Sequence, residues 1–309
     1  MGLRSRLNKS INRVVSYYLM NYKKMIFMPI AVLILLSGVV AYHYYVYGSP
    51  INPGISLSGG VSATVSTNAA VSPSFIISDI SSAVKQPVEV AVLHAPLSNA
   101  VIGYTITTTD SVNSTVFKQD VASIFHISPD SSSISLTLVA ASLAQSSLDS
   151  AIYLLIIAFG LVAVVSFFYF RNGVQAFSNV ISIISDVVNI IAVVDILGLR
   201  FSTASIAGIL MIMGYSADRN IILATNILKR KDATVRYRLV HTIKTSLTMD
   251  AAAFVTFLIL IVGSTNSTII SIATILIIGV LFDDFTVWIL NGSIQLAGIR
   301  YDPVAEASV

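Results

Sequence analysis

Residues 203–228 read TASIAGILMIMGYSADRNIILATNIL, a run long and apolar enough to cross a bilayer that nevertheless contains Asp218 and Arg219. A transmembrane helix needs about 20 apolar residues. A charged residue at the bilayer centre costs about 2.5 to 3.5 kcal/mol on insertion scales. The pair therefore indicates a functional site inside a membrane-spanning segment.

Five further stretches have a similar length and hydropathy. They lie at 25–46, 151–170, 177–198, 244–262 and 269–291. Hydrophobic residues make up 55% of the chain and charged residues 11%, with a mean hydropathy of +0.83, which is outside the range of soluble domains. The sequence therefore predicts an α-helical polytopic membrane protein with six transmembrane helices.

Basic residues indicate the orientation of these helices. Lys and Arg are frequent before the first stretch and again at 229–238, and the positive-inside rule places both regions in the cytoplasm. With six crossings, both termini are then cytoplasmic in a multi-pass protein of the cell membrane, and 47–148 is extracytoplasmic. The first stretch lacks a small-residue cleavage site and is expected to be a retained anchor.

The N-terminal segment, 1–24, has an amphipathic helical pattern. Its apolar residues fall on one face, and basic residues lie largely off that face. The apolar row is Leu3, Leu7, Ile11, Val14 and Tyr18. The pattern predicts either a basic helix on the inner membrane surface or a simple orientation signal.

The segment between the first two stretches changes period and predicts a small α+β domain. Strands are expected at 62–66, 88–93, 103–109 and 133–139, and helices at 75–84 and 115–125. Strands interleaved with two helices suggest the split βαβ arrangement. We therefore divide the chain into a cytoplasmic N-terminus (1–24), the first transmembrane helix (25–46), an extracytoplasmic α+β domain (47–148), transmembrane helices two to six (149–291) and a cytoplasmic tail (292–309).

Acidic residues occur at a common depth in the last four stretches. They are Asp186, Asp218, Asp250, Asp283 and Asp284. Four of them lie roughly 6 to 10 residues from the inner ends of their helices, which corresponds to about 9 to 15 Å at about 1.5 Å per residue. Carboxyls gathered in one slab can exchange protons, so Asp218, Arg219, Asp186, Asp250 and Asp283 are the candidates for a proton relay. Chance scatter or structural polar contacts would give the same pattern.

Several motifs in the chain resemble SecF, the smaller subunit of the SecD/SecF export complex, in its archaeal form. GYSADRNIILATNILKR (214–230), with Gly214, Tyr215 and Ser216, resembles the fourth-span signature of that family. The stretches 185–211, 244–260 and 275–291 resemble the neighbouring spans. GISLSGG (54–60), with Gly54, Gly59 and Gly60, resembles a G-x-D-x-x-G-G element, although Ser56 replaces its Asp.

This resemblance implies one half of an RND-superfamily transporter that pairs with SecD. It further implies a SecYEG-type translocon as partner, secreted polypeptides as substrates, and proton flow that moves the outer domains. No enzymatic activity, cofactor, metal or nucleic acid is expected. His241 stands where bacterial relatives tend to have Arg. It is expected either to be a plain interfacial histidine or, if that Arg is a functional partner, to replace it only when protonated.

Other functions fit the sequence less well. An intramembrane aspartyl protease would carry G-x-G-D, a zinc protease H-E-x-x-H and a nucleotide-driven pump G-x-x-x-x-G-K-[ST], and the chain contains none of these motifs. There are no cysteines to hold a metal through thiolates. An RND-type exporter subunit for lipids or small molecules, and a purely structural Sec subunit without proton movement, remain the alternatives.

Overall fold

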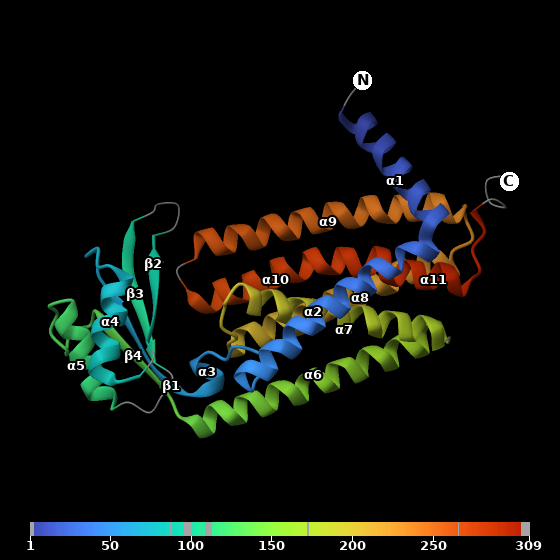
Figure 1. Cartoon of the computed structure of the whole chain (residues 1–309). Helices are drawn as coiled ribbons and strands as arrows, with labels where there is room; N and C mark the ends of the chain where they lie inside the picture. The colour runs from blue at the N-terminus through green and yellow to red at the C-terminus, as the bar shows by residue number, and fades with distance from the viewer. Residues whose placement is uncertain are drawn as a thin grey trace.

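The computed structural model describes residues 3–86, 88–95, 100–108, 113–171, 173–264 and 266–303. Six helical segments among them are long and apolar enough to cross a membrane, which confirms the predicted fold class (Figure 1). These segments are Phe27–Tyr47, Ser142–Phe170, Gly173–Ile196, Thr203–Lys229, Val235–Gly263 and Thr268–Gly298. Most extend past the predicted stretches because helical hydrogen bonding continues beyond the apolar core.

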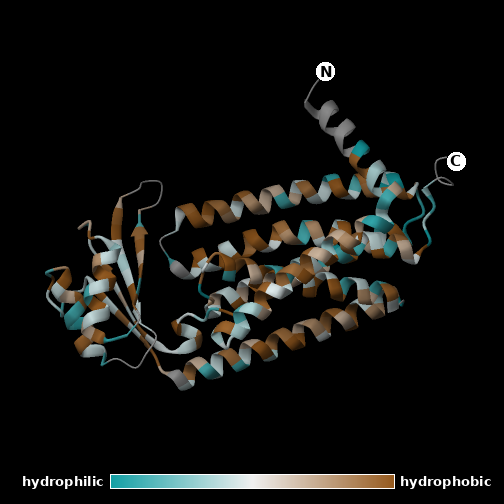
Figure 2. Cartoon of the chain, viewed as in Figure 1, coloured by the Kyte–Doolittle hydropathy of each residue, from teal (hydrophilic) through white to brown (hydrophobic). Residues whose placement is uncertain are grey.

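The helices form one elongated bundle. Its elements are α2 (Phe27–Tyr47), α6 (Ala141–Phe170), α7 (Gly173–Ile196), α8 (Thr203–Ala224), π-helix η1 (Thr225–Lys229), α9 (Val235–Gly263), α10 (Ser267–Phe285), π-helix η2 (Thr286–Asn291) and α11 (Gly292–Gly298). Hydrophobic residues follow the length of these helices (Figure 2). In the most apolar 18-residue stretch of α7, 61% of the residues are buried, whereas in that of α9 only 6% are buried. Helix α7 is therefore central and α9 peripheral.

Apolar packing fills the half of the bundle nearest the sheet. Ile190, Ile209 and Ile275 are buried in one cluster contributed by α7, α8 and α10. Gly208 allows α8 to approach α10 closely, since a Cβ there would lie 3.0 Å from Ile275 Cγ2. Polar side chains gather in the other half, so the bundle has a dry end and a polar end.

The α+β domain lies at one end of the bundle, and both termini lie at the opposite end (Figure 1). Its elements are β1 (Gly60–Ser66), α4 (Pro73–Val84), β2 (Val88–His94), β3 (Val101–Thr108), α5 (Ser114–Ile124) and β4 (Ile134–Val139). The strands pair antiparallel in the order β2-β3-β1-β4, with Ala63 opposite both Ile106 and Leu136. This is the predicted split βαβ arrangement.

Each strand and helix predicted for this domain is present, with boundaries that differ by a few residues. Thr109, the predicted last residue of the third strand, lies outside the described residues. One face of the sheet carries the apolar core: Val61, Val65 and Tyr104 are buried against Ile76 of α4 and Phe117 of α5. Alternation in the strands and helical spacing in α4 and α5 explain this single core.

Helix α1 (Leu3–Met25) has a buried face that matches the predicted one only in part. The side chains of residues 3–11 lie outside the described part of the chain. Val14, expected on the apolar face, is 67% exposed, whereas Tyr18, also expected there, is buried as predicted. Val15, Leu19 and Tyr22 are buried with it against the ends of α8, α9 and α11. The second half of α1 therefore packs on protein along a row shifted by about one residue, because the bundle offers it an apolar surface.

Candidate functional site

Arg219 lies at the centre of a buried ionic cluster. Its Nη1 donates to Asp283 Oδ2 at 2.5 Å, and its Nη2 lies 3.1 Å from Asp250 Oδ2. The same Nη2 also donates to Asp284. One guanidinium of α8 therefore joins α9 and α10 through three carboxyls. We call Asp186, Arg219, Asp250, Asp283 and Asp284 the ionic cluster.

Asp186 brings α7 into this cluster. Its side chain is completely buried and accepts hydrogen bonds from Ser216 at 2.8 Å and from Thr286. The carboxyl of Asp283 is close enough to interact with it directly. Among the described residues Asp186 forms no ion pair with a cation, so neutral hydroxyl donors hold this carboxyl in place.

The G-Y-S stretch that resembles the family signature places two side chains, Tyr215 and Ser216, against the ionic cluster. Tyr215 donates to Asp250 Oδ1, and Ser246 donates to Asp250 Oδ2 at 3.2 Å. The guanidinium of Arg219 also lies 5.5 Å from the centroid of the Tyr215 ring, within cation–π range. Gly214 is exposed, and a Cβ added there would meet no atom within 4 Å.

The charges of the cluster do not balance. Four carboxyls face one guanidinium, and Asp186, Asp250, Asp283 and Arg219 are each no more than 6% exposed. Several uncompensated charges in a low-dielectric site would cost many kcal/mol. Within the described ranges no group of three or more metal-binding side chains is placed to hold a metal ion.

Asp218 lies outside the cluster, although the sequence made it a candidate for the proton relay. It directly precedes Arg219, and successive α-helical residues point about 100° apart. Arg219 therefore faces the bundle interior, while Asp218 is exposed in an outward row with Met211 and Ile222. No ion pair of Asp218 occurs in the part of the chain that the structure describes. Asp186, Asp250 and Asp283, by contrast, are brought together with Arg219.

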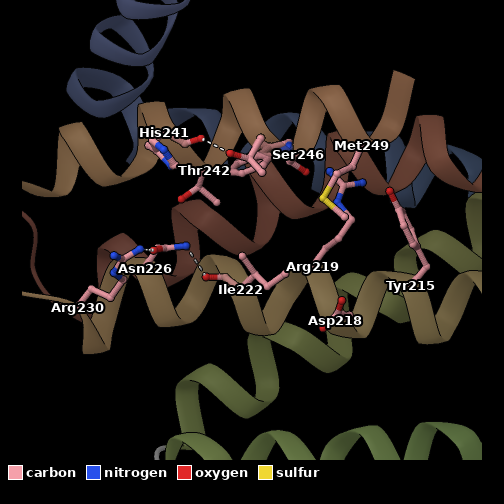
Figure 3. A pocket seen from close by; sticks show the side chains of 12 residues that line it. Tyr215, Asp218, Arg219, Ile222, Asn226, Arg230, His241, Thr242, Ser246 and Met249 are labelled. Atoms are coloured by element: carbon pink, nitrogen blue, oxygen red, sulfur yellow. Dashed lines mark hydrogen bonds between the residues drawn. The ribbon is translucent and has the colours of Figure 1, made fainter. Parts of the chain in front are cut away.

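A groove of about 180 Å³ runs beside the cluster, between α8 with η1 on one side and α9 on the other (Figure 3). Asp218 and Arg219 line one end, and Arg230 and His241 line the other. His241 is exposed, as expected for an interfacial residue. Two N–H donors that line the groove, Arg219 Nε and Trp288 Nε1, are buried without a partner among the described residues.

A second polar group, missed in the sequence, extends from the cluster toward the end of the bundle that carries the termini. Asn291 donates to Asn179 Oδ1 at 3.1 Å and to Asn220, and Gln295 donates to Asn291 Oδ1 at 2.8 Å. Ser178 also donates to Asn291. All five side chains are completely buried. We call them the amide network.

Spacing on α7 could have revealed this network. Gln175, Asn179, Ser182, Asp186 and Asn189 recur every three or four residues, and all are buried. A polar row at this spacing occupies one helical face, so Asp186 is part of a polar stripe. A search for charged residues alone overlooks the amides in that stripe.

The stretch 54–60, which resembles a glycine-rich element of the family, connects α8 to the sheet domain. Gly54 N–H donates to Phe201 O at 2.7 Å, and Phe201 N–H donates to Asn52 O at 2.8 Å. A Cβ on Gly54 would lie 3.0 Å from Phe201 O, which explains the glycine. Ser56 Oγ accepts from the N–H of Thr203, the first residue of α8, at 3.2 Å. A serine hydroxyl thus accepts at the helix N-terminus, at the position where the element that this stretch resembles has Asp.

Gly59 and Gly60 follow the short helix α3 (Ile55–Ser58). Their φ angles are +81° and +135°, which L-residues rarely adopt, so both glycines are required where the chain turns into β1. Arg200, just before α8, also pairs with Glu89 of β2. The sheet domain is therefore attached to the first turn of α8 by several bonds.

Comparison with known proteins shows the family. Residues 119–299 match the model of the protein export membrane protein SecD/SecF, C-terminal. The protein-export membrane protein SecF of Pyrococcus furiosus is 31% identical over 276 residues, covering 89% of this chain and 90% of that protein. SecF of Methanocaldococcus jannaschii is 28% identical, covering 89% of this chain and 94% of that protein.

The fold agrees with this result. The crystal structure of SecDF from Thermus thermophilus, described as a translocon-associated membrane protein, superposes with a TM-score of 0.70 at 15% identity. It aligns with 92% of this chain, which spans 38% of that longer protein. The names of these relatives describe membrane proteins of protein export rather than enzymes. The chain therefore belongs to the SecD/SecF family of protein-export membrane proteins, on its archaeal SecF branch.

Proposed function

We propose that this chain, together with SecD, promotes the export of polypeptides through a SecYEG-type translocon, driven by the proton gradient rather than by enzymatic catalysis. The ionic cluster carries this proposal. Its members come from four helices, and it holds more carboxyls than guanidinium groups can neutralise. Each proton gained or lost changes the attraction between those helices.

Helix α8 provides the mechanical connection to the sheet domain. Arg219 lies on the same helix as Thr203, about 24 Å along its axis at about 1.5 Å per residue. The first turn of that helix is bonded to the segment that leads into β1. Because an α-helix resists compression, an axial shift of α8 at the cluster displaces the base of the sheet domain.

Asp218 supports SecD as the partner. An exposed carboxylate in a membrane-spanning helix is costly in lipid, so the outward row of α8 needs a polar neighbour from another chain. A helix of SecD in this position would complete a two-part transporter. In the proposed orientation the termini are cytoplasmic and the sheet domain lies outside the cell, where it contacts the emerging polypeptide.

The decisive experiment measures export in inverted membrane vesicles that contain this chain and SecD. Asp283→Asn keeps the shape of the side chain but fixes its charge, so stimulation of export by the proton gradient should be lost. Asp232→Asn is the control, since that exposed side chain pairs with Arg230 outside the cluster. An uncoupler should reduce wild-type export to the level of Asp283→Asn.

The alternatives give different results. A purely structural subunit predicts that Asp283→Asn assembles with SecD and exports normally, with an unchanged response to the uncoupler. A lipid or small-molecule exporter predicts that export of a secretory precursor does not depend on this chain. Either result would overturn the proposal.

A further inference from the structure

The amide network and the ionic cluster are joined through Ser216 by two hydrogen bonds. Asn220 Nδ2 donates to Ser216 Oγ at 3.3 Å, and Ser216 Oγ donates to Asp186 Oδ2 at 2.8 Å. A hydroxyl has one hydrogen to donate and lone pairs that accept. Because the Asn220 NH₂ donates to a lone pair of Ser216 Oγ, the Ser216 hydroxyl hydrogen is directed at the Asp186 carboxyl.

Asn291 determines how Asn220 is oriented. A carboxamide presents its oxygen on one side and its NH₂ on the other, and rotation by half a turn exchanges them. The Nδ2 of Asn291 donates to Asn220 Oδ1, which leaves the NH₂ of Asn220 facing Ser216. Asn291 itself is held through its Oδ1, which accepts from Gln295 and Ser178.

The π-helix η2 places Asn291 in this position. Thr286 and Asn291 are five residues apart and would point about 140° apart on an α-helix at about 3.6 residues per turn. In η2 both side chains are completely buried, Thr286 against Asp186 and Asn291 against Asn220. Wide turns of this kind occur frequently at functional sites. The extra residue keeps two polar contacts on one face of the helix.

We infer that Asn291 is a positioning residue for the Asp186 carboxyl and acts on it through Asn220 and Ser216. The inference rests on the proposed function, in which Asp186 belongs to the proton-binding cluster. No member of the amide network is charged, so its influence on Asp186 passes through hydrogen-bond direction. The charged neighbours of Asp186 itself are the Asp283 carboxyl and, behind it, Arg219.

Reaction with dicyclohexylcarbodiimide tests the inference, because this apolar reagent labels protonated carboxyls inside membranes. The full chain in nanodiscs is treated across a pH series, and the adduct on Asp186 is quantified by peptide mass spectrometry. Asn291→Leu should accelerate labelling of Asp186 severalfold at neutral pH, because the carboxylate loses a donor that stabilises its ionised form. Asn226→Leu, an amide outside the network, should leave the rate unchanged.

A double-mutant cycle separates positioning from general damage. Asn220→Leu and Asn291→Leu should each accelerate labelling, and the double variant should label no faster than either, since both act through one path. If Asn291→Leu fails to fold, Asn291→Ala, which also lacks the donor to Asn220, is measured instead. Unchanged labelling in a folded Asn291 variant, or additive effects, would refute the inference. If the export proposal is wrong, the vesicle assay will show it. The labelling rates do not depend on export.

Discussion

Arg219 of α8 and Asp283 of α10 form a charged hydrogen bond of 2.5 Å in the interior of the membrane bundle. The guanidinium is shared with Asp250 and Asp284, so removal of one cation leaves three carboxyls without their counter-ion. Stability and ion binding therefore depend on the same side chain. This dependence makes Arg219 the most informative residue to substitute.

Arg219→Leu should destabilise the protein by about 3 to 5 kcal/mol, the usual effect of breaking a buried ion pair. The midpoint of thermal unfolding in detergent reports it, followed through Trp288, the single tryptophan of the chain. A second change, Asp283→Asn, removes one of the carboxyls that have lost their counter-ion and should recover part of the loss. A double variant as unstable as the sum of both single variants would contradict the shared-cation arrangement.

Asp218→Asn should leave the unfolding midpoint unchanged, because Asp218 is exposed and outside the cluster. It should instead reduce the amount of SecD that co-purifies from native membranes, since the carboxylate would lose its polar neighbour. Asp232→Asn, on the connection between η1 and α9, is the matched control. Normal recovery of SecD with Asp218→Asn would exclude this face of α8 from the interface.

Thr286→Val removes a hydroxyl of nearly the same size and leaves Asp186 with one donor fewer. An unsatisfied buried polar group costs about 1 to 3 kcal/mol, and the unfolding midpoint should fall accordingly. Thr256→Val is the control, because that hydroxyl is exposed on α9 and donates to the carbonyl of Ala252 in the same helix. Equal effects at both sites would mean that the bond from Thr286 to Asp186 contributes nothing specific.

Gly54→Ala should lower stability by about 1 to 3 kcal/mol through overpacking, because the new Cβ would lie 3.0 Å from Phe201 O. Gly38→Ala, where a Cβ meets no atom within 4 Å, should be neutral or slightly stabilising. Limited proteolysis of the segment before β1 provides a second measurement. Cleavage there should increase in Gly54→Ala alone.

Ser56→Ala removes the acceptor for the Thr203 N–H and should cost about 0.5 to 2 kcal/mol, as other helix-capping acceptors do. Ser56→Asp keeps an acceptor and adds negative charge at the N-terminus of α8, which the helix dipole favours. The aspartate variant should therefore unfold at the wild-type temperature or above it. A large loss in Ser56→Asp would show that the hydroxyl has a role a carboxylate cannot take.

The sequence predicted the architecture because its signals are periodic. Apolar runs of bilayer length predicted six helices, and alternation predicted the four strands of the sheet. The position of Asp186, Asp250 and Asp283 in one layer also followed from counting residues along each helix. Depth in the membrane depends on rise per residue alone, and sequence spacing measures it well.

The direction in which each side chain points was not predictable in the same way. Asp218 and Arg219 have almost the same depth, and only the packing of α8 against α7 and α10 determines which of them faces inward. The amides of Asn179 and Asn291 were missed because they carry no charge. Their burial depends on the π-helix η2, and the composition of the apolar stretch does not reveal its extra residue.

That extra residue in η2 has a consequence for comparing related chains. A sixth transmembrane helix that lacked this residue would be one position shorter between the residues equivalent to Thr286 and Asn291. Its amide would then stand one position earlier. Alignment of such a chain should show a single-residue gap inside an otherwise unbroken hydrophobic segment. The gap would divide the family into chains that link their intramembrane acids to the amides and chains that do not.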